Sequence, residues 1–140
     1  MSFYLDANVL VALLTPDPLS ERAEAFLSTG ALGFFVSDFG AAEFVSVVGR
    51  RIRNLEITLA DGRIALSNLD GWVARDAQRV ESSAGDVAAA DTYLRRLDLT
   101  LLTPDAIHIA IAARIGATIV TFDRAMAASA RTLGMAVTTP

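Results

Sequence analysis

The fold is decided by residues 104–123, which read PDAIHIAIAARIGATIVTFD. Thr103, just before this stretch, is a favoured N-cap residue, and the proline that follows fits the first helical position, where no backbone N–H is needed. The pattern predicts a helix over residues 104–114 that ends at Gly116, because glycine readily adopts the left-handed conformation of a helix stop. Residues 117–120 are few and mostly β-branched, which favours a buried strand.

This predicted helix and strand each carry an acid at one end. Asp105 falls in the first turn of the helix, where the positive end of the helix dipole tolerates a negative charge. Asp123 lies just past the carboxyl end of the strand. Ligands of open α/β sheets bind at that edge. We therefore expect both acids at one functional rim.

The composition limits the chemistry that such a rim can perform. With 140 residues, 53% of them hydrophobic, the chain is long enough for one domain, residues 1–140, with a sizeable core. The net charge of -4 does not favour non-specific nucleic-acid binding through a broad basic surface. There is no Cys, no Lys and only one His, which excludes disulfides, a Walker A loop, a Schiff-base lysine and paired-histidine sites. Polar chemistry is left to carboxylates, hydroxyls, Asn and Arg.

No targeting or membrane segment is recognisable in the sequence. The apolar N-terminal stretch has no basic residues before it, and no run of 18 apolar residues occurs. We therefore expect a cytoplasmic protein without a membrane partner.

The rest of the chain alternates predicted strands with predicted helices. This alternation indicates an α/β fold with a mostly parallel sheet covered by helices on both faces. The expected strands are residues 2–5, 33–37, 77–81, 117–120 and 135–138, and the other expected helices are 9–14, 18–28, 39–53, 58–75, 83–96 and 124–133, with Asp38 as the cap of the helix 39–53.

Two more acids join Asp105 and Asp123. Asp6 ends the first predicted strand, and Glu43 lies among apolar residues inside the helix 39–53. Four neighbouring carboxylates repel one another unless they are protonated or bridged by a cation, and Mg²⁺ prefers oxygen ligands. Each acid taken alone is equally well explained as a helix start, a cap or a structural hydrogen-bonding residue. The four together favour a site.

Two further residues have a functional and a structural interpretation. Arg50 follows Glu43 by seven residues and lies on nearly the same helix face, about 10 Å along the axis. It is a candidate contact for an RNA phosphate, but Arg50, Arg51 and Arg53 also suit the negative end of the helix dipole. His108 shares a face with Asp105. A general base is conceivable there, but a structurally satisfied histidine near the site is the favoured interpretation.

Four motifs together resemble a known family. LDANVL at 5–10, AEF at 42–44, DAIHIA at 105–110 and GATIVTFD at 116–123 are similar to the motifs of PIN domains, and most of all to the VapC toxin ribonucleases of prokaryotic toxin–antitoxin pairs. The resemblance implies a three-layer α/β/α sandwich and Mg²⁺- or Mn²⁺-dependent cleavage of RNA, single-stranded or structured. It also implies a cognate antitoxin partner. We further expect a homodimer.

The resemblance makes Asp6, Glu43, Asp105 and Asp123 the acidic quartet, with Asn8 and Thr121 as accessory polar residues. The chemistry agrees: Asp6, Asp105 and Asp123 are expected metal ligands, and Glu43 is expected to orient a water or act as a base. Asn8 and Thr121 are expected to hold ligand oxygens from behind.

Two other functions compete with this reading. An aspartate-dependent phosphatase or receiver also places an Asp after its first parallel strand. The supporting Lys is missing, however, and Asn8 stands where the phosphatase pattern has a second Asp. A non-catalytic PIN-like binding module would be favoured by a lost acid, and all four acids are present.

Overall fold

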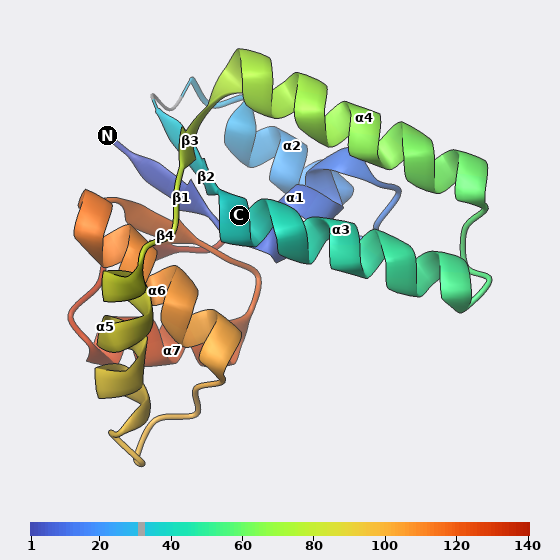
Figure 1. Cartoon of the computed structure of the whole chain (residues 1–140). Helices are drawn as coiled ribbons and strands as arrows, with labels where there is room; N and C mark the ends of the chain where they lie inside the picture. Colours follow the sequence, from blue (N-terminus) through green and yellow to red (C-terminus); the bar gives the residue numbers. More distant parts are fainter. Residues whose placement is uncertain (31–32) are drawn as a thin grey trace.

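The structure is a computed structural model that describes residues 1–30 and 33–140 (Figure 1). Its central sheet has the strand order β3-β2-β1-β4-β5, and every neighbouring pair is parallel. This confirms the expected α/β fold with a parallel sheet. The strands are β1 (Phe3–Leu5), β2 (Phe34–Ser37), β3 (Ala77–Val80), β4 (Thr118–Val120) and β5 (Val137–Thr138). The helices are α1 (Ala7–Leu14), α2 (Ser20–Leu27), α3 (Asp38–Arg53), α4 (Leu59–Asp76), α5 (Ala84–Leu94), α6 (Thr103–Ile115) and α7 (Arg124–Thr132).

Helices cover both faces of the sheet, as Figure 1 shows. Successive strand residues point to opposite faces. Phe3 and Leu5 of β1 accordingly belong to a core cluster with α1, α3 and α4, whereas Tyr4 belongs to a second cluster with α6 and α7. The result is the expected three-layer sandwich.

The central strand β1 lies where the strand order of the sheet reverses: β2 and β3 follow on one side of it, and β4 and β5 on the other. It pairs with β2 on one side and with β4 on the other, where Leu5 is in register with Val120. Helix α1 leaves β1 toward the first core cluster, and α7 leaves β4 toward the second. The connections after these two strands therefore separate, which creates the kind of crevice where open α/β sheets bind ligands.

Two helix starts differ from the prediction. Helix α6 begins at Thr103, so the extended Leu102 is its N-cap and the prediction of Thr103 as the cap was wrong. Helix α3 begins at Asp38, and the cap is Ser37, whose hydroxyl accepts a hydrogen bond from the Gly40 N–H. The stop at Gly116 is confirmed by its left-handed backbone, with φ of 66°.

Asp38 does not cap α3 as expected but connects two segments of the chain. Its carboxylate accepts hydrogen bonds from the N–H groups of Phe39 and Ser82, and so fixes the segment after β3 to the start of α3. In the part of the chain that the structure describes, no helix is long and apolar enough to cross a membrane.

Candidate active site

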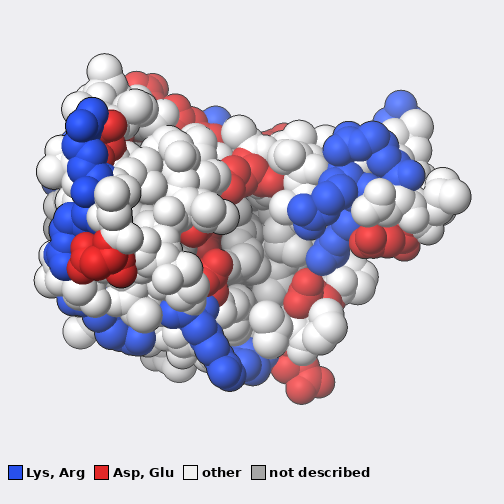
Figure 2. All heavy atoms as spheres, turned by 90° about the horizontal axis from the view of Figure 1, so that it is seen from below, with Lys and Arg blue, Asp and Glu red and all other residues white. Residues whose placement is uncertain are grey.

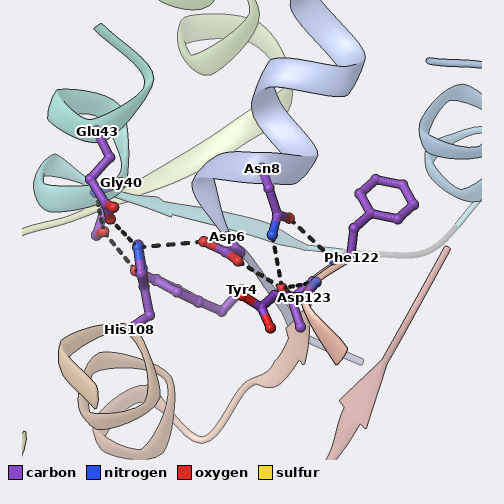
Figure 3. A network of polar contacts seen from close by, with 10 residues as sticks. Tyr4, Asp6, Asn8, Gly40, Glu43, His108, Phe122 and Asp123 are labelled. Carbon is purple, nitrogen blue, oxygen red and sulfur yellow. Dashed lines mark hydrogen bonds and ion pairs between the residues drawn. The ribbon is translucent and has the colours of Figure 1, made fainter. Parts of the chain in front are cut away.

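Asp6 and Asp123 lie at the carboxyl ends of β1 and β4, and polar side chains join these two ends (Figure 3). The Thr121 hydroxyl donates a hydrogen bond of 2.7 Å to Asp6 Oδ2 and accepts one of 3.1 Å from the Asn8 amide. Asn8 Oδ1 in turn accepts from the Phe122 N–H at 3.2 Å. Asn8 and Thr121 therefore hold Asp6 in place and tie the two strand ends together.

Asp123 has both a structural and a possible chemical role. Its Oδ1 accepts a hydrogen bond of 2.9 Å from the Met126 N–H and so caps α7. Its own N–H donates to the Thr121 hydroxyl at 3.0 Å, which places it beside Asp6. Capping uses Oδ1, so Oδ2 is left for a further partner.

Glu43 reaches the site from α3 and meets His108 of α6. His108 Nε2 is hydrogen-bonded to Glu43 Oε1 and lies 3.5 Å from Asp6 Oδ1 (Figure 3). The His108 side chain is only 1% exposed, whereas that of Glu43 is 33% exposed. The imidazole is therefore a buried contact between two of the acids. This agrees with the expected structurally satisfied histidine.

The electrostatics of the site show an excess of negative charge. Burial raises the pKa of Asp6, and the charge of Glu43 adds to this, although His108 and Thr121 act in the opposite direction. Burial, followed by the charges of Asp123 and Asp6, raises the pKa of Asp105 to about 6. The negative charges of the other two aspartates therefore act on Asp105, which lies in the first turn of α6. Burial lowers the pKa of His108, but Glu43 and Asp6 raise it overall.

The donor set suits a hard divalent cation by its chemistry. Asp6, Asp105 and Asp123 offer carboxylate oxygens, and a cation would remove the repulsion that raises the pKa of Asp105. Within residues 1–30 and 33–140, no three His, Asp or Glu side chains are arranged closely enough to hold a metal ion as they stand.

One face of the molecule is hollowed. Figure 2 shows acidic residues within the depression between two parts of the molecule and basic residues on both flanks. A separate groove of about 680 Å³ runs between α3 and α4, and none of the four acids lines it. We therefore locate the candidate site by its side chains and not by the size of the hollow.

The structure distinguishes the arginines at the end of α3. Arg51 pairs with Asp17 at 3.1 Å and donates to the Thr15 hydroxyl, so its role is structural. Arg50 is exposed, and no ion pair to it occurs within the described residues. Arg50 stays a predicted phosphate contact.

Sequence reasoning missed three residues behind the acids. Tyr4, Ser37 and Gly40 lie in one hydrogen-bonded chain with His108 (Figure 3). The available signals were a tyrosine inside an apolar strand and a glycine three residues before Glu43 in a helix.

Comparisons with known proteins identify the family of the chain. The PIN domain family model matches residues 3–131, so the chain belongs to the PIN domain family. It is 32% identical over 142 residues to Ribonuclease VapC46 of Mycobacterium tuberculosis, with 99% of this chain and 98% of that protein covered.

Two solved structures share the fold. One is the crystal structure of Mycobacterium tuberculosis VapC20, a Sarcin-Ricin loop cleaving toxin, with a TM-score of 0.77, 17% identity and 99% of each chain covered. The other is VapBC2 from Rickettsia felis bound to a DNA fragment from the promoter, with a TM-score of 0.71, 19% identity and coverage of 100% of this chain and 99% of that one.

Proposed function

We propose that this protein is a divalent-metal-dependent endoribonuclease that cleaves single-stranded RNA, with Asp6, Glu43, Asp105 and Asp123 as its catalytic acids. The observation that carries the proposal is the placement of the acids at one rim: Thr121 is hydrogen-bonded to Asp6 and to the Asp123 N–H, and His108 lies between Asp6 and Glu43. The charges of Asp123 and Asp6 also contribute to the raised pKa of Asp105. Carboxylates that raise one another's pKa at a strand rim are typical of functional sites. The 32% identity to a ribonuclease supports RNA as the substrate.

In the proposed mechanism, Asp6, Asp105 and Asp123 would hold a divalent cation, and Asn8 and Thr121 hold Asp6 and the strand ends in place. When bound there, Mg²⁺ or Mn²⁺ would supply a lowered pKa for a water molecule and would neutralise charge on the phosphodiester. Glu43 accepts a proton from the attacking water at Oε2, the oxygen that His108 does not hold. The water oxygen bonds to phosphorus while the bond from phosphorus to the leaving ribose oxygen breaks, and that oxygen takes up a proton from solvent water.

An RNA cleavage assay tests this proposal. Purified protein should cut a fluorescent single-stranded RNA in Mn²⁺ and stop when EDTA is added. Asp6→Asn and Asp123→Asn should both abolish cleavage. Asp91→Asn is the matched control, because Asp91 is exposed on α5 and, among the residues that the structure describes, pairs only with Arg95, the C-cap of that helix. Equal cleavage in EDTA would contradict metal dependence, and folded parent protein without any cleavage would favour a non-catalytic binding module.

The same proposal includes a toxin role in the cytoplasm, with a cognate antitoxin and a homodimeric assembly. Its support is the similarity to VapC46 over 99% of this chain. Expression of the chain alone should arrest growth, and Asp6→Asn should remove the arrest. Co-expression of the neighbouring gene product should also relieve it. Normal growth on expression of active nuclease would contradict the toxin role and leave the nuclease proposal standing.

A further inference from the structure

A buried chain of hydrogen bonds runs behind the acids and ends on Glu43 (Figure 3). The Gly40 N–H donates to the Ser37 hydroxyl at 2.9 Å, and Ser37 Oγ lies 2.7 Å from the Tyr4 hydroxyl. The Tyr4 hydroxyl lies 2.6 Å from His108 Nδ1, and His108 Nε2 is bonded to Glu43. Ser37, Tyr4 and His108 are all fully or almost fully buried. A buried polar chain persists only when its members satisfy one another.

The chemistry of these groups fixes which nitrogen of His108 faces Glu43 as a donor. An ionised carboxylate only accepts hydrogen bonds, so Nε2 must carry a proton. The phenol of Tyr4 can either donate to Nδ1 or accept from it. The Nε2–H bond to Glu43 is therefore kept whether the imidazole is neutral or charged, and Tyr4 determines the ring orientation in both states.

The backbone at Gly40 allows α3 to approach this chain closely. A Cβ at position 40 would lie 3.4 Å from His108 Cε1 and 3.3 Å from Ser37 Oγ, closer than most side-chain contacts. Gly40 and Glu43 are three residues apart on α3 and therefore on the same face. The hydrogen-bonded chain thus begins and ends on one turn of α3, so the place of the His108 ring determines the place of the Glu43 carboxylate.

We propose that His108 is a positioning residue, which holds the Glu43 carboxylate toward Asp6 while Tyr4 and Ser37 fix the orientation of the imidazole. The inference rests on the proposed function in that Glu43 is taken as a member of the active site. His108 itself is 1% exposed and donates its Nε2 proton to Glu43, so it does not reach the substrate. It acts on the reaction through the acids that it contacts, Glu43 and, at 3.5 Å, Asp6.

Nuclear magnetic resonance of the metal-free protein tests the positioning without any activity. His108 is the only histidine in the chain, so its ring nitrogens give the only imidazole signals. We expect an Nε2-bound proton that exchanges slowly with water. Glu43→Gln should shift the Nε2 signal, and Tyr4→Phe should shift the Nδ1 signal. Tyr93→Phe is the matched control, because Tyr93 packs against the same core cluster as Tyr4 and should leave both signals unchanged.

Kinetics with single-stranded RNA and Mn²⁺ then separate positioning from a merely structural role. Tyr4→Phe and His108→Leu should lower kcat about 10- to 100-fold with little change in KM, the range for residues that orient catalytic groups. His108→Gln, whose amide can donate in place of Nε2, should recover part of kcat. Backbone spectra of each variant report whether it is folded.

Two results would overturn the inference: imidazole signals that do not respond to Glu43→Gln and Tyr4→Phe, or a folded Tyr4→Phe variant with the parent's kcat. An inactive parent whose imidazole signals respond as expected would overturn the proposed nuclease and confirm the hydrogen-bonded chain. The two proposals can therefore fail separately.

Discussion

Asp6 and Asp86 are both buried aspartates, with 7% and 1% exposure, yet their surroundings are opposite. Asp86 of α5 is bound through both carboxylate oxygens by Arg114 of α6, at 2.8 and 2.9 Å, and it also accepts from the Ser83 N–H. The hydrogen bonds from Arg114, above all, lower the pKa of Asp86 below its usual value. The pKa of Asp6 is raised, because burial outweighs what His108 and Thr121 provide.

Asp86 is thus a carboxylate that joins two helices, whereas Asp6 is the one that we propose as a ligand of a metal ion. Asp86 has its charge compensated by a guanidinium in a bidentate pair, the strong form of a charge-assisted hydrogen bond. Asp6 lies at the strand rim beside other acids, and its compensation is incomplete. We propose that this incomplete compensation lowers the stability of the metal-free protein and suits a carboxylate that binds a cation.

The largest expected effect concerns activity. Asp6→Asn should lower RNA cleavage in Mn²⁺ by at least about a hundredfold, because it removes a ligand charge from the reacting site. Asp86→Asn, assayed at a temperature where it is folded, should cleave at nearly the parent rate. Initial rates on one fluorescent RNA measure both. A comparable loss in the two variants would remove the distinction between the two aspartates.

The second expected effect is on stability, where Asp86→Asn should be affected more than Asp6→Asn, the reverse of the order expected for activity. Asp86→Asn should lower the free energy of unfolding by about 2 kcal/mol, because Arg114 loses its charged partner. We keep this value below the range for fully buried pairs, because the Arg114 side chain is 41% exposed. Asp6→Asn in EDTA should be at least as stable as the parent. Urea unfolding of the three proteins is the measurement, and a destabilised Asp6→Asn would assign Asp6 a structural role.

A third effect is the pH dependence that Asp105 confers on the metal-free protein. Its pKa is about 6 in the folded state and 3.8 in a model peptide, so the folded state binds more protons between these values. Stability in EDTA should therefore fall as the pH rises from about 4 to about 6. Asp105→Asn should remove this fall and be more stable at pH 7 by about 1.5 kcal/mol, after a discount for solvent screening. Melting curves that change with pH in the same way for the parent and for Asp105→Asn would contradict the raised pKa of Asp105.

The smallest effect separates the two roles of Asp123. Asp123→Ala should cost about 1 kcal/mol of stability, because the cap of α7 is lost, whereas Asp123→Asn should change stability by only a few tenths. Both variants should lose cleavage activity. Thermal melts and the RNA assay together make the comparison. An active Asp123→Asn would make Asp123 a cap only.

The fold and the positions of the acids at the rim follow from local patterns in the sequence. The alternation of short β-branched runs with longer helical stretches predicted the parallel sheet. Asp6 was placed because it directly follows a buried strand, and Asp123 because it lies just past the end of another. The roles of these acids stay predictions. Some boundaries were missed by a residue or two, as at Thr103, which is the first residue of α6 and not its cap, and within the described part of the chain no side chain caps that helix start.

The contacts behind the acids could not be predicted, because they join residues far apart in the chain. Tyr4 and His108 are 104 residues apart, and His108 and Glu43 are 65 residues apart. The Arg114 partner of Asp86 is likewise 28 residues away. Local periodicity places each of these residues on an element, but only the packing of α3 and α6 on the sheet decides which side chains meet.

Calorimetric titration with Mn²⁺ tests most directly whether incomplete compensation of Asp6 marks a cation site. The parent protein should bind Mn²⁺, Asp86→Asn should bind it with the same affinity, and Asp6→Asn should bind it at least about tenfold more weakly. At a hundredfold excess over the dissociation constant, Mn²⁺ should also stabilise the parent by about 2.7 kcal/mol. Equal binding by the parent and Asp6→Asn, or no binding by the folded parent, would contradict the account.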